Sequence, residues 1–157
     1  MKEDLLIVDD HPLILEGLEK LLVSMDNYNV YKANSAKEGL EVLEERAIKL
    51  LVTDYAMPEI NGLEFCKSVK SRFPKTKIIV LTQIDELLLV KNFLNIGVEG
   101  IILKDNEPNI LISGIKSGLK DSQFYCPFTI NVGDGQIEIE AAEQGETFLD
   151  YDKRFWD

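Results

Sequence analysis

Four short apolar runs, each ending in a polar residue, constrain the fold of this chain more than any other feature. They are rich in leucine, isoleucine and valine, and they span residues 4–9, 49–54, 77–82 and 99–104. Runs without polar alternation predict strands that are buried on both faces, as in a parallel sheet covered by helices. A weaker strand is expected near residues 28–33. The sequence therefore predicts a sheet of five parallel strands.

Segments with helical spacing of apolar residues lie between and after the predicted strands. They cover residues 13–22, 40–43, 63–69, 87–96 and 110–119. Strands that alternate with helices are joined by right-handed crossovers and form open sheets with helices on both faces. We therefore expect the α/β class, with a doubly wound parallel sheet of five strands and five flanking helices.

The composition changes after residue 120. Residues 121–157 hold nine acidic and two basic side chains, which is −7 of the total net charge of −11. Apolar and polar residues alternate on both sides of a Gly-Asp-Gly turn, which predicts a β-hairpin over residues 128–140. Four aromatic residues between positions 148 and 156 favour a docking segment over a purely solvated tail. We expect one domain at residues 1–120, followed by an acidic C-terminal extension at residues 121–157.

Charge and composition exclude several classes of protein. The net charge of −11 repels nucleic acid phosphates, so we expect no DNA binding by this chain alone. The chain has no apolar run of about 18 residues, and its first residues lack the features of a secretory signal. We therefore expect a cytoplasmic protein without membrane contacts. Cys66 and Cys126 are far apart and are interpreted as ordinary thiols.

Polar side chains stand where four of the predicted strands end. They are Asp9, Asp10, Asp54, Thr82 and Lys104. The carboxyl ends of parallel strands meet at one edge of the sheet, where doubly wound folds bind their ligands. A single Asp at a strand end is more often a turn or cap residue. The common register of all five residues, however, favours a shared site.

Three carboxylates at one site repel each other unless a divalent cation or a lysine neutralises them. Mg²⁺ prefers oxygen ligands, and we expect Asp10, Asp54 and the backbone carbonyl of Ala56 to hold it, with Mn²⁺ as an alternative ion. A carboxylate can also attack a phosphoryl group when a metal and a positioned cation offset the charge. Asp54 is then the expected nucleophile and Lys104 the expected cation.

The same residues resemble a known family. Asp9-Asp10, the segment from Asp54 to Gly62, Thr82 and the segment from Gly97 to Lys104 look like the receiver domains of response regulators in two-component signal transduction. Each motif is weak by itself, but the residue types recur at the matching strand ends with the matching intervals. The resemblance covers residues 3–120. It implies a flavodoxin-like sheet in strand order 2-1-3-4-5.

This resemblance implies a set of roles. A sensor histidine kinase or a phosphotransfer protein would phosphorylate Asp54, and the domain would switch conformation to control an output. Asp10 and Asp54 would ligate Mg²⁺, Asp9 would help through water, and Lys104 would hold a phosphoryl oxygen. The hydroxyl of Thr82 would turn toward the phosphoryl group and act as the switch. The domain would catalyse its own phosphotransfer and dephosphorylation without being an enzyme in the conventional sense.

Three positions complicate the resemblance. The family commonly has Tyr or Phe where this chain has Ile101, so the aromatic half of the switch is missing, whereas phosphorylation does not need the ring. Gln83 stands where small residues are frequent, and its amide could hinder the hydrolytic water, which predicts a long-lived phosphorylated form. His11 is interpreted as a helix-start residue and left out of the metal site, because Mg²⁺ prefers oxygen.

Other functions stay open at this point. A receiver-like interaction module that acts without phosphorylation is one alternative, because Ile101 departs from the pattern. A phosphoaspartyl hydrolase of the haloacid-dehalogenase type is another, although Ala56 stands where that class needs an acidic residue. A nucleotide-binding domain is a further alternative, but the sequence lacks the glycine motifs of that class.

The Asp10-His11-Pro12-Leu13 start and Lys104-Asp105 resemble a branch of the family that often carries a helix-turn-helix output domain, which is not recognisable here. Homodimerisation, the kinase and the output are not specified.

Overall fold

The computed structural model describes residues 2–25, 27–83, 87–104, 108–119, 129–132 and 135–138. The strands of the main sheet are β1 (Glu3–Val8), β2 (Tyr28–Ala33), β3 (Leu50–Asp54), β4 (Lys77–Thr82) and β5 (Gly100–Leu103). The helices are α1 (Pro12–Val23), α2 (Ala36–Glu45), α3 (Gly62–Arg72), α4 (Leu87–Ile96) and α5 (Pro108–Leu119).

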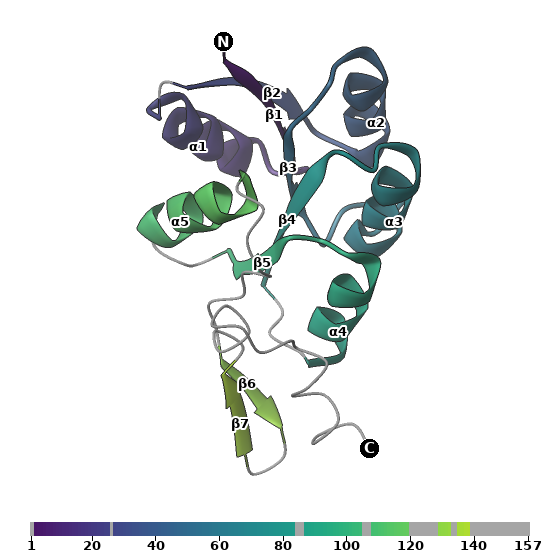
Figure 1. Cartoon of the computed structure of the whole chain (residues 1–157), viewed down its shortest axis with the longest axis vertical. Coiled ribbons are helices and arrows are strands. Elements are labelled where there is room, and N and C mark those ends of the chain that lie inside the picture. Colours follow the sequence, from purple (N-terminus) through teal and green to yellow (C-terminus); the bar gives the residue numbers. More distant parts are fainter. Residues whose placement is uncertain are drawn as a thin grey trace.

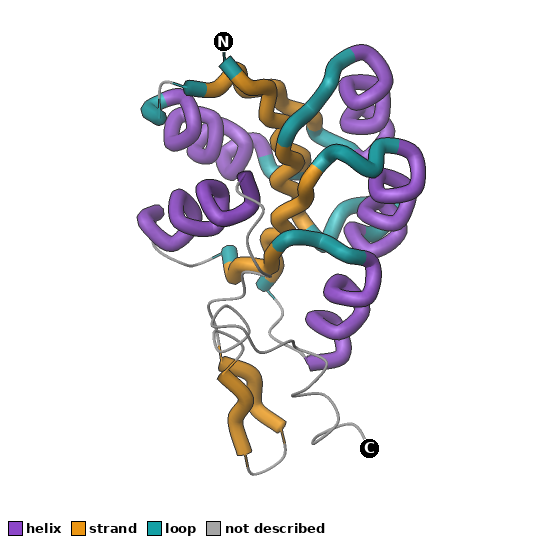
Figure 2. Tube along the Cα trace, in the orientation of Figure 1, coloured by secondary structure: helices purple, strands orange, loops and turns teal. Residues whose placement is uncertain are grey.

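The five strands are parallel and lie in the order β2-β1-β3-β4-β5 (Figure 1). Helices α1 and α5 cover one face of the sheet, and α2, α3 and α4 cover the other (Figure 2). The α/β class, the strand order and the five flanking helices are therefore confirmed. In the described part of the chain, every helix is too short or too polar to cross a lipid bilayer.

The core consists of two apolar layers, one on each face of the sheet. Successive side chains of a strand point to opposite faces. Leu5 and Ile7 of β1 accordingly pack with α1 and α5, whereas Leu6 and Val8 pack on the side of α2, α3 and α4. All four side chains are fully buried. Burial on both faces explains why these strands lack polar alternation.

The loop from β3 to α3 has a tight turn that keeps it close to the end of β3. Gly62 donates its backbone N–H to the carbonyl of Tyr55 over 2.7 Å. A Cβ atom at Gly62 would lie 2.6 Å from the Cα of Tyr55, so a larger residue would push the loop away. The side chain of Asn61 caps α3 by accepting the N–H of Glu64. The residues after Asp54 are thus held in place.

A pair of β6 (Thr129–Val132) and β7 (Gly135–Glu138) forms a separate antiparallel hairpin in which Ile130 lies opposite Ile137. The hairpin predicted over residues 128–140 is present, and β6 contacts α4. The aromatic residues at positions 148–156 and Cys126 lie outside the described residues. The domain boundary at residue 120 stays a prediction.

Candidate functional site

The carboxyl ends of four neighbouring strands bring the polar residues together. Val8 lies opposite Thr53, Asp54 opposite Leu81, and Thr82 opposite Leu103 in the strand registers. The neighbouring strands therefore end at similar heights. At this edge of the sheet lie Asp9 and Asp10 after β1, Asp54 at the end of β3, Thr82 at the end of β4 and Lys104 after β5.

A lysine bridges two buried carboxylates at the centre of the site. The Nζ atom of Lys104 lies 2.9 Å from Oδ2 of Asp9 and 3.1 Å from Oδ1 of Asp54. The side chains of Asp9 and Asp54 are 1% and 3% exposed, and that of Lys104 is 9% exposed. The Oδ1 atom of Asp54 also accepts a long hydrogen bond of 3.4 Å from the backbone N–H of Ala56. Asp54 is thus fixed by a charge and a backbone donor.

The titration of these groups reflects their burial and their mutual charges. Burial raises the pKa of Asp54, and the charge of Asp9 raises it further, while Lys104 opposes both effects. Burial alone would lower the pKa of Lys104, but its hydrogen bonds to Asp9 and Asp54 and their charges raise it. The ammonium group therefore remains positive, and a second cation at the site would favour the ionised form of Asp54.

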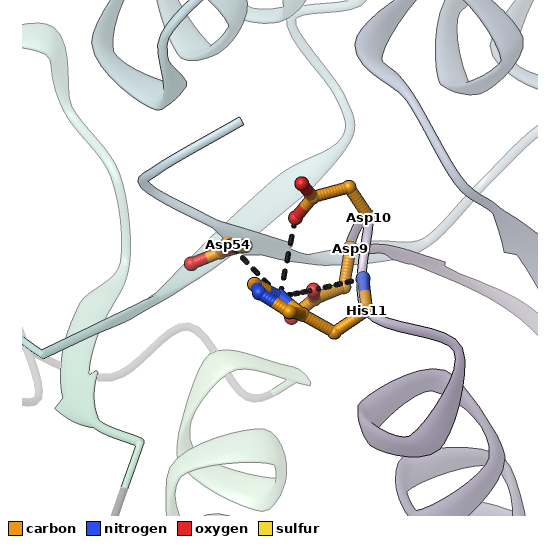
Figure 3. A group of neighbouring side chains, drawn as sticks. All are labelled: Asp9, Asp10, His11 and Asp54. Carbon is orange, nitrogen blue, oxygen red and sulfur yellow. Dashed lines mark hydrogen bonds and ion pairs between the residues drawn. The ribbon is translucent and has the colours of Figure 1, made fainter. Parts of the chain in front are cut away.

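His11 occupies the space between the carboxylates (Figure 3). Its Nδ1 atom lies 2.8 Å from Oδ1 of Asp9 and 3.1 Å from Oδ1 of Asp10. The hydrogen bond to Asp9 and the charge of Asp10 raise the pKa of His11. The sequence interpretation left this residue out of the site. Its position directly after the acidic pair was the signal that pointed to it.

The donor set fits a divalent cation. Asp9, Asp10, His11 and Asp54 each offer a ligand atom, and these four atoms lie within 4.8 Å of one another. The buried Oδ2 atom of Asp54 accepts no hydrogen bond within the described residues, whereas Oδ2 of Asp9 lies 2.9 Å from Lys104 and Oδ1 of Asp10 lies 3.1 Å from His11. Buried carboxylate oxygens that lack donors are natural ligands for a hard cation.

A cavity of about 120 Å³ opens beside Asp54. It is lined by His11, Asp54, Tyr55, Ala56, Thr82, Gln83 and Lys104. Thr82 is 1% exposed and Gln83 is exposed at the mouth. The structure therefore places every residue singled out for phosphoryl chemistry around one small cavity or in direct contact with its lining. It also places Gln83 where a long side chain borders the entrance.

Ile101 lies in the interior of the protein, away from this cavity. It is fully buried in β5, opposite Val80 of β4, and it belongs to the apolar layer that includes Phe93 of α4. An aliphatic side chain packed in this way has no ring to exchange between a buried and an exposed position.

Comparison with protein families agrees with this fold and site. The family model described as the response regulator receiver domain matches residues 5–116. The chain belongs to this family, and its matched region is the receiver domain of a two-component response regulator.

Several curated proteins are similar in sequence. The transcriptional regulatory protein YdfI of Bacillus subtilis is 31% identical over 146 residues, which cover 92% of this chain and 68% of that protein. A nitrate/nitrite response regulator protein homolog of Haemophilus influenzae is 30% identical over 116 residues, or 73% of this chain and 56% of its own length. This chain therefore spans little more than half of the Haemophilus protein.

Solved structures show the same likeness. The isolated receiver domain of RcsB from Salmonella enterica serovar Typhimurium, determined with the phosphomimetic BeF₃⁻, has a TM-score of 0.74 and 29% identity, and the match covers 80% of this chain and 94% of that chain. A CheY-like receiver domain protein from Methanospirillum hungatei has a TM-score of 0.71 and 30% identity, with coverage of 76% and 94%.

Proposed function

We propose that this receiver accepts a phosphoryl group on Asp54 from a sensor histidine kinase or a phosphotransfer protein, with the help of Mg²⁺. The observation that carries the proposal is the contact of a buried Asp54 with Lys104 over 3.1 Å beside two further carboxylates. A buried carboxylate that only capped a turn would need neither the lysine nor the acidic neighbours.

In the proposed reaction, a carboxylate oxygen of Asp54 forms a bond to phosphorus. The bond between phosphorus and the donor's imidazole nitrogen breaks, and that nitrogen leaves with the electron pair. Lys104 lies beside Asp54, where its ammonium group offsets the charge on the transferred oxygens. Thr82 borders the cavity and would donate its hydroxyl to one of these oxygens.

The metal ligands are proposed from the same geometry. Asp10 and Asp54 would hold Mg²⁺ directly, the backbone carbonyl of Ala56 would add a third protein ligand, and Asp9 would act through water. When bound, the ion supplies positive charge that neutralises the carboxylates and the phosphoryl oxygens. Mn²⁺ satisfies the same oxygen ligands.

The donor protein would approach Asp54 along α1. At the start of this helix, beside the site, the apolar side chains of Leu13 and Ile14 are exposed, at 82% and 38%. They line an apolar groove together with Leu111 of α5 and Lys104 of the site. Large exposed apolar groups beside a reactive centre suit contact with another protein. The same groove could also accommodate a second copy of this chain, and we retain a homodimer as a proposal.

The switch and the output are proposed more coarsely. Phosphorylation would shift Thr82. This movement would reach α4 through the segment that follows β4, while Ile101 stays in place. Some of the curated relatives are named transcriptional regulatory proteins, so we propose control of transcription as the output and the cytoplasm as its place. With a net charge of −11, this chain would act through a partner or a further region and not by binding DNA itself.

Two other functions make different predictions. A phosphorylation-independent interaction module, which the buried Ile101 favours, would bind its partner equally well without Asp54. A phosphatase of the haloacid-dehalogenase type would turn over p-nitrophenyl phosphate, which we do not expect because Ala56 supplies no acidic group.

Beryllofluoride binding tests the proposal. Beryllofluoride with Mg²⁺ should raise the melting temperature of the wild type, because a ligand that binds only the folded state stabilises it. The Asp54→Ala variant should show no such shift. The absence of any shift in the wild type, or an equal shift in both proteins, would remove Asp54 as the acceptor.

A further inference from the structure

The imidazole of His11 lies among the carboxylates of Asp9, Asp10 and Asp54 (Figure 3). Its Nδ1 atom lies 2.8 Å from Asp9, 3.1 Å from Asp10 and 4.0 Å from Asp54, measured to the nearest carboxylate oxygen given for each pair. The site therefore offers one nitrogen and three oxygen donors, whereas a site for Mg²⁺ needs oxygen alone.

These separations match the spacing of ligands around a divalent ion. An octahedral ion holds its ligands at roughly 2.1 Å, which places neighbouring ligands about 3.0 Å apart and opposite ligands about 4.2 Å apart. Relative to His11, the oxygens of Asp9 and Asp10 lie at the neighbouring distance and the oxygen of Asp54 lies near the opposite distance. The ring thus stands where a fourth protein ligand would stand.

Two further observations support a ligand role for the ring. The side chain of Asp54 is almost fully buried, and its Oδ2 atom, the oxygen that faces His11, accepts no hydrogen bond within the described residues. The backbone N–H of His11 donates to Oδ1 of Asp9 over 2.9 Å, and Pro12 begins α1 directly after it. The backbone at His11 is therefore fixed while its side chain, 59% exposed, can approach an ion from the solvent side.

We propose that His11 is an additional metal ligand that lets this site bind a borderline transition ion such as Co²⁺, Ni²⁺ or Zn²⁺ in competition with Mg²⁺. Imidazole nitrogen suits these ions, whereas Mg²⁺ prefers oxygen and retains water. The inference rests on the proposed function, in which Asp10 and Asp54 hold Mg²⁺ directly and Asp9 acts through water. A transition ion would use the imidazole of His11 and an oxygen of Asp9 as additional direct ligands. An ion held by His11 and the carboxylates occupies the place of Mg²⁺, so the two ions cannot be bound at the same time.

The test compares two ions in three forms of the untagged full chain. The affinities for Co²⁺ and Mg²⁺ are measured by titration calorimetry for the wild type, His11→Asn and Asp10→Asn. We expect the ratio of Co²⁺ to Mg²⁺ affinity to fall at least about tenfold in His11→Asn, because only Co²⁺ uses the imidazole. Asp10→Asn serves as the matched control: it should weaken both ions without lowering this ratio.

A spectroscopic readout tests whether the ion lies beside the ring. His11 is the only histidine in the chain, so its ring protons are the only imidazole signals in the NMR spectrum. Co²⁺ should shift these signals strongly, and the shift should be lost in Asp10→Asn. The inference fails if His11→Asn keeps the affinity ratio within about twofold of the wild type, or if the ring signals do not shift. If neither ion binds in a manner that depends on Asp10, the proposed function itself fails.

Discussion

Glu59, in the loop after β3, is the one non-glycine residue with a positive φ angle, 73°, among the described residues. A side chain in this left-handed region costs about 1 kcal/mol relative to glycine. We predict that Glu59→Gly raises the free energy of unfolding by up to about 1 kcal/mol, measured by urea denaturation. The control, Glu41→Gly on the exposed side of α2, should lower it by a similar amount. A loss of stability in Glu59→Gly would show that the strain is not significant.

Gln83 borders the cavity that contains Asp54, and a shorter residue there would open a path for the hydrolytic water. If Asp54 is phosphorylated, Gln83→Ala should lose its phosphoryl group about threefold faster or more, which corresponds to a small change in the activation barrier. Decay is followed by intact mass after the phosphodonor is removed. Asn95→Ala, on the exposed side of α4, should decay at the wild-type rate. An unchanged or slower decay in Gln83→Ala would remove the proposed role.

At the residue scale, the sequence was sufficient to predict that Asp9, Asp54 and Lys104 lie together, but not that the ring of His11 lies among the carboxylates. Asp9, Asp54 and Lys104 each stand where a predicted strand ends, and the strand pairing places these ends side by side. The direction of the His11 ring depends on how α1 begins over the acidic pair, and that angle is set by packing. Residue types alone therefore favoured a helix-start interpretation.

At the scale of elements, an ion pair ties α3 to the amino ends of β4 and β5. Lys70 of α3 forms an ion pair with Glu99, just before β5, and also donates to the carbonyl of Thr76, just before β4, while Glu99 accepts the N–H of Ile78. Both charged side chains are less than one-fifth exposed. No short-range pattern pairs residues 29 positions apart, so this contact could not be predicted from the sequence.

This pair should give the stability a pH dependence. Burial raises the pKa of Glu99 above 4.5, although Lys70 opposes the rise. The folded state then holds the proton more tightly than the unfolded state, so the contribution of Glu99 is greatest below pH 4.5 and is lost as the pH rises through the raised pKa. We predict that the free energy of unfolding of the wild type, relative to that of Glu99→Gln, falls as the pH rises from 4.5 through the raised pKa. Urea denaturation at a series of pH values measures this difference. A relative stability that rises with pH would contradict the dominance of burial.

At the scale of the whole molecule, the alternation of apolar strands and amphipathic helices was sufficient to predict the α/β sandwich. Strands such as β1 must be apolar on both faces to lie between two layers of helices, and this requirement is visible in the sequence. The placement of the hairpin against α4 was not predictable, because its alternating residues fix strand pairing but not the surface on which the pair lies.

The hairpin should stabilise the domain through this contact, since an isolated two-stranded hairpin is at best marginally stable. We predict that ending the chain after Lys120 lowers the free energy of unfolding by about 1 kcal/mol or more, measured by urea denaturation alongside sedimentation. A chain that ends after Glu140 retains β6 and β7 and should keep most of the stability. Equal stability and the same oligomeric state in all three chains would argue against docking of the extension.

The central claim is that Asp54 is the phosphoryl acceptor, and direct phosphorylation tests it best. Acetyl phosphate with Mg²⁺ should add the mass of one phosphoryl group to the intact wild-type chain, and chelation of Mg²⁺ should prevent the addition. Asp54→Asn should gain nothing, whereas Glu59→Gln, which removes an exposed carboxylate from the neighbouring loop, should be modified like the wild type. An unmodified wild type, or an Asp54→Asn variant modified to the same extent, would contradict the account.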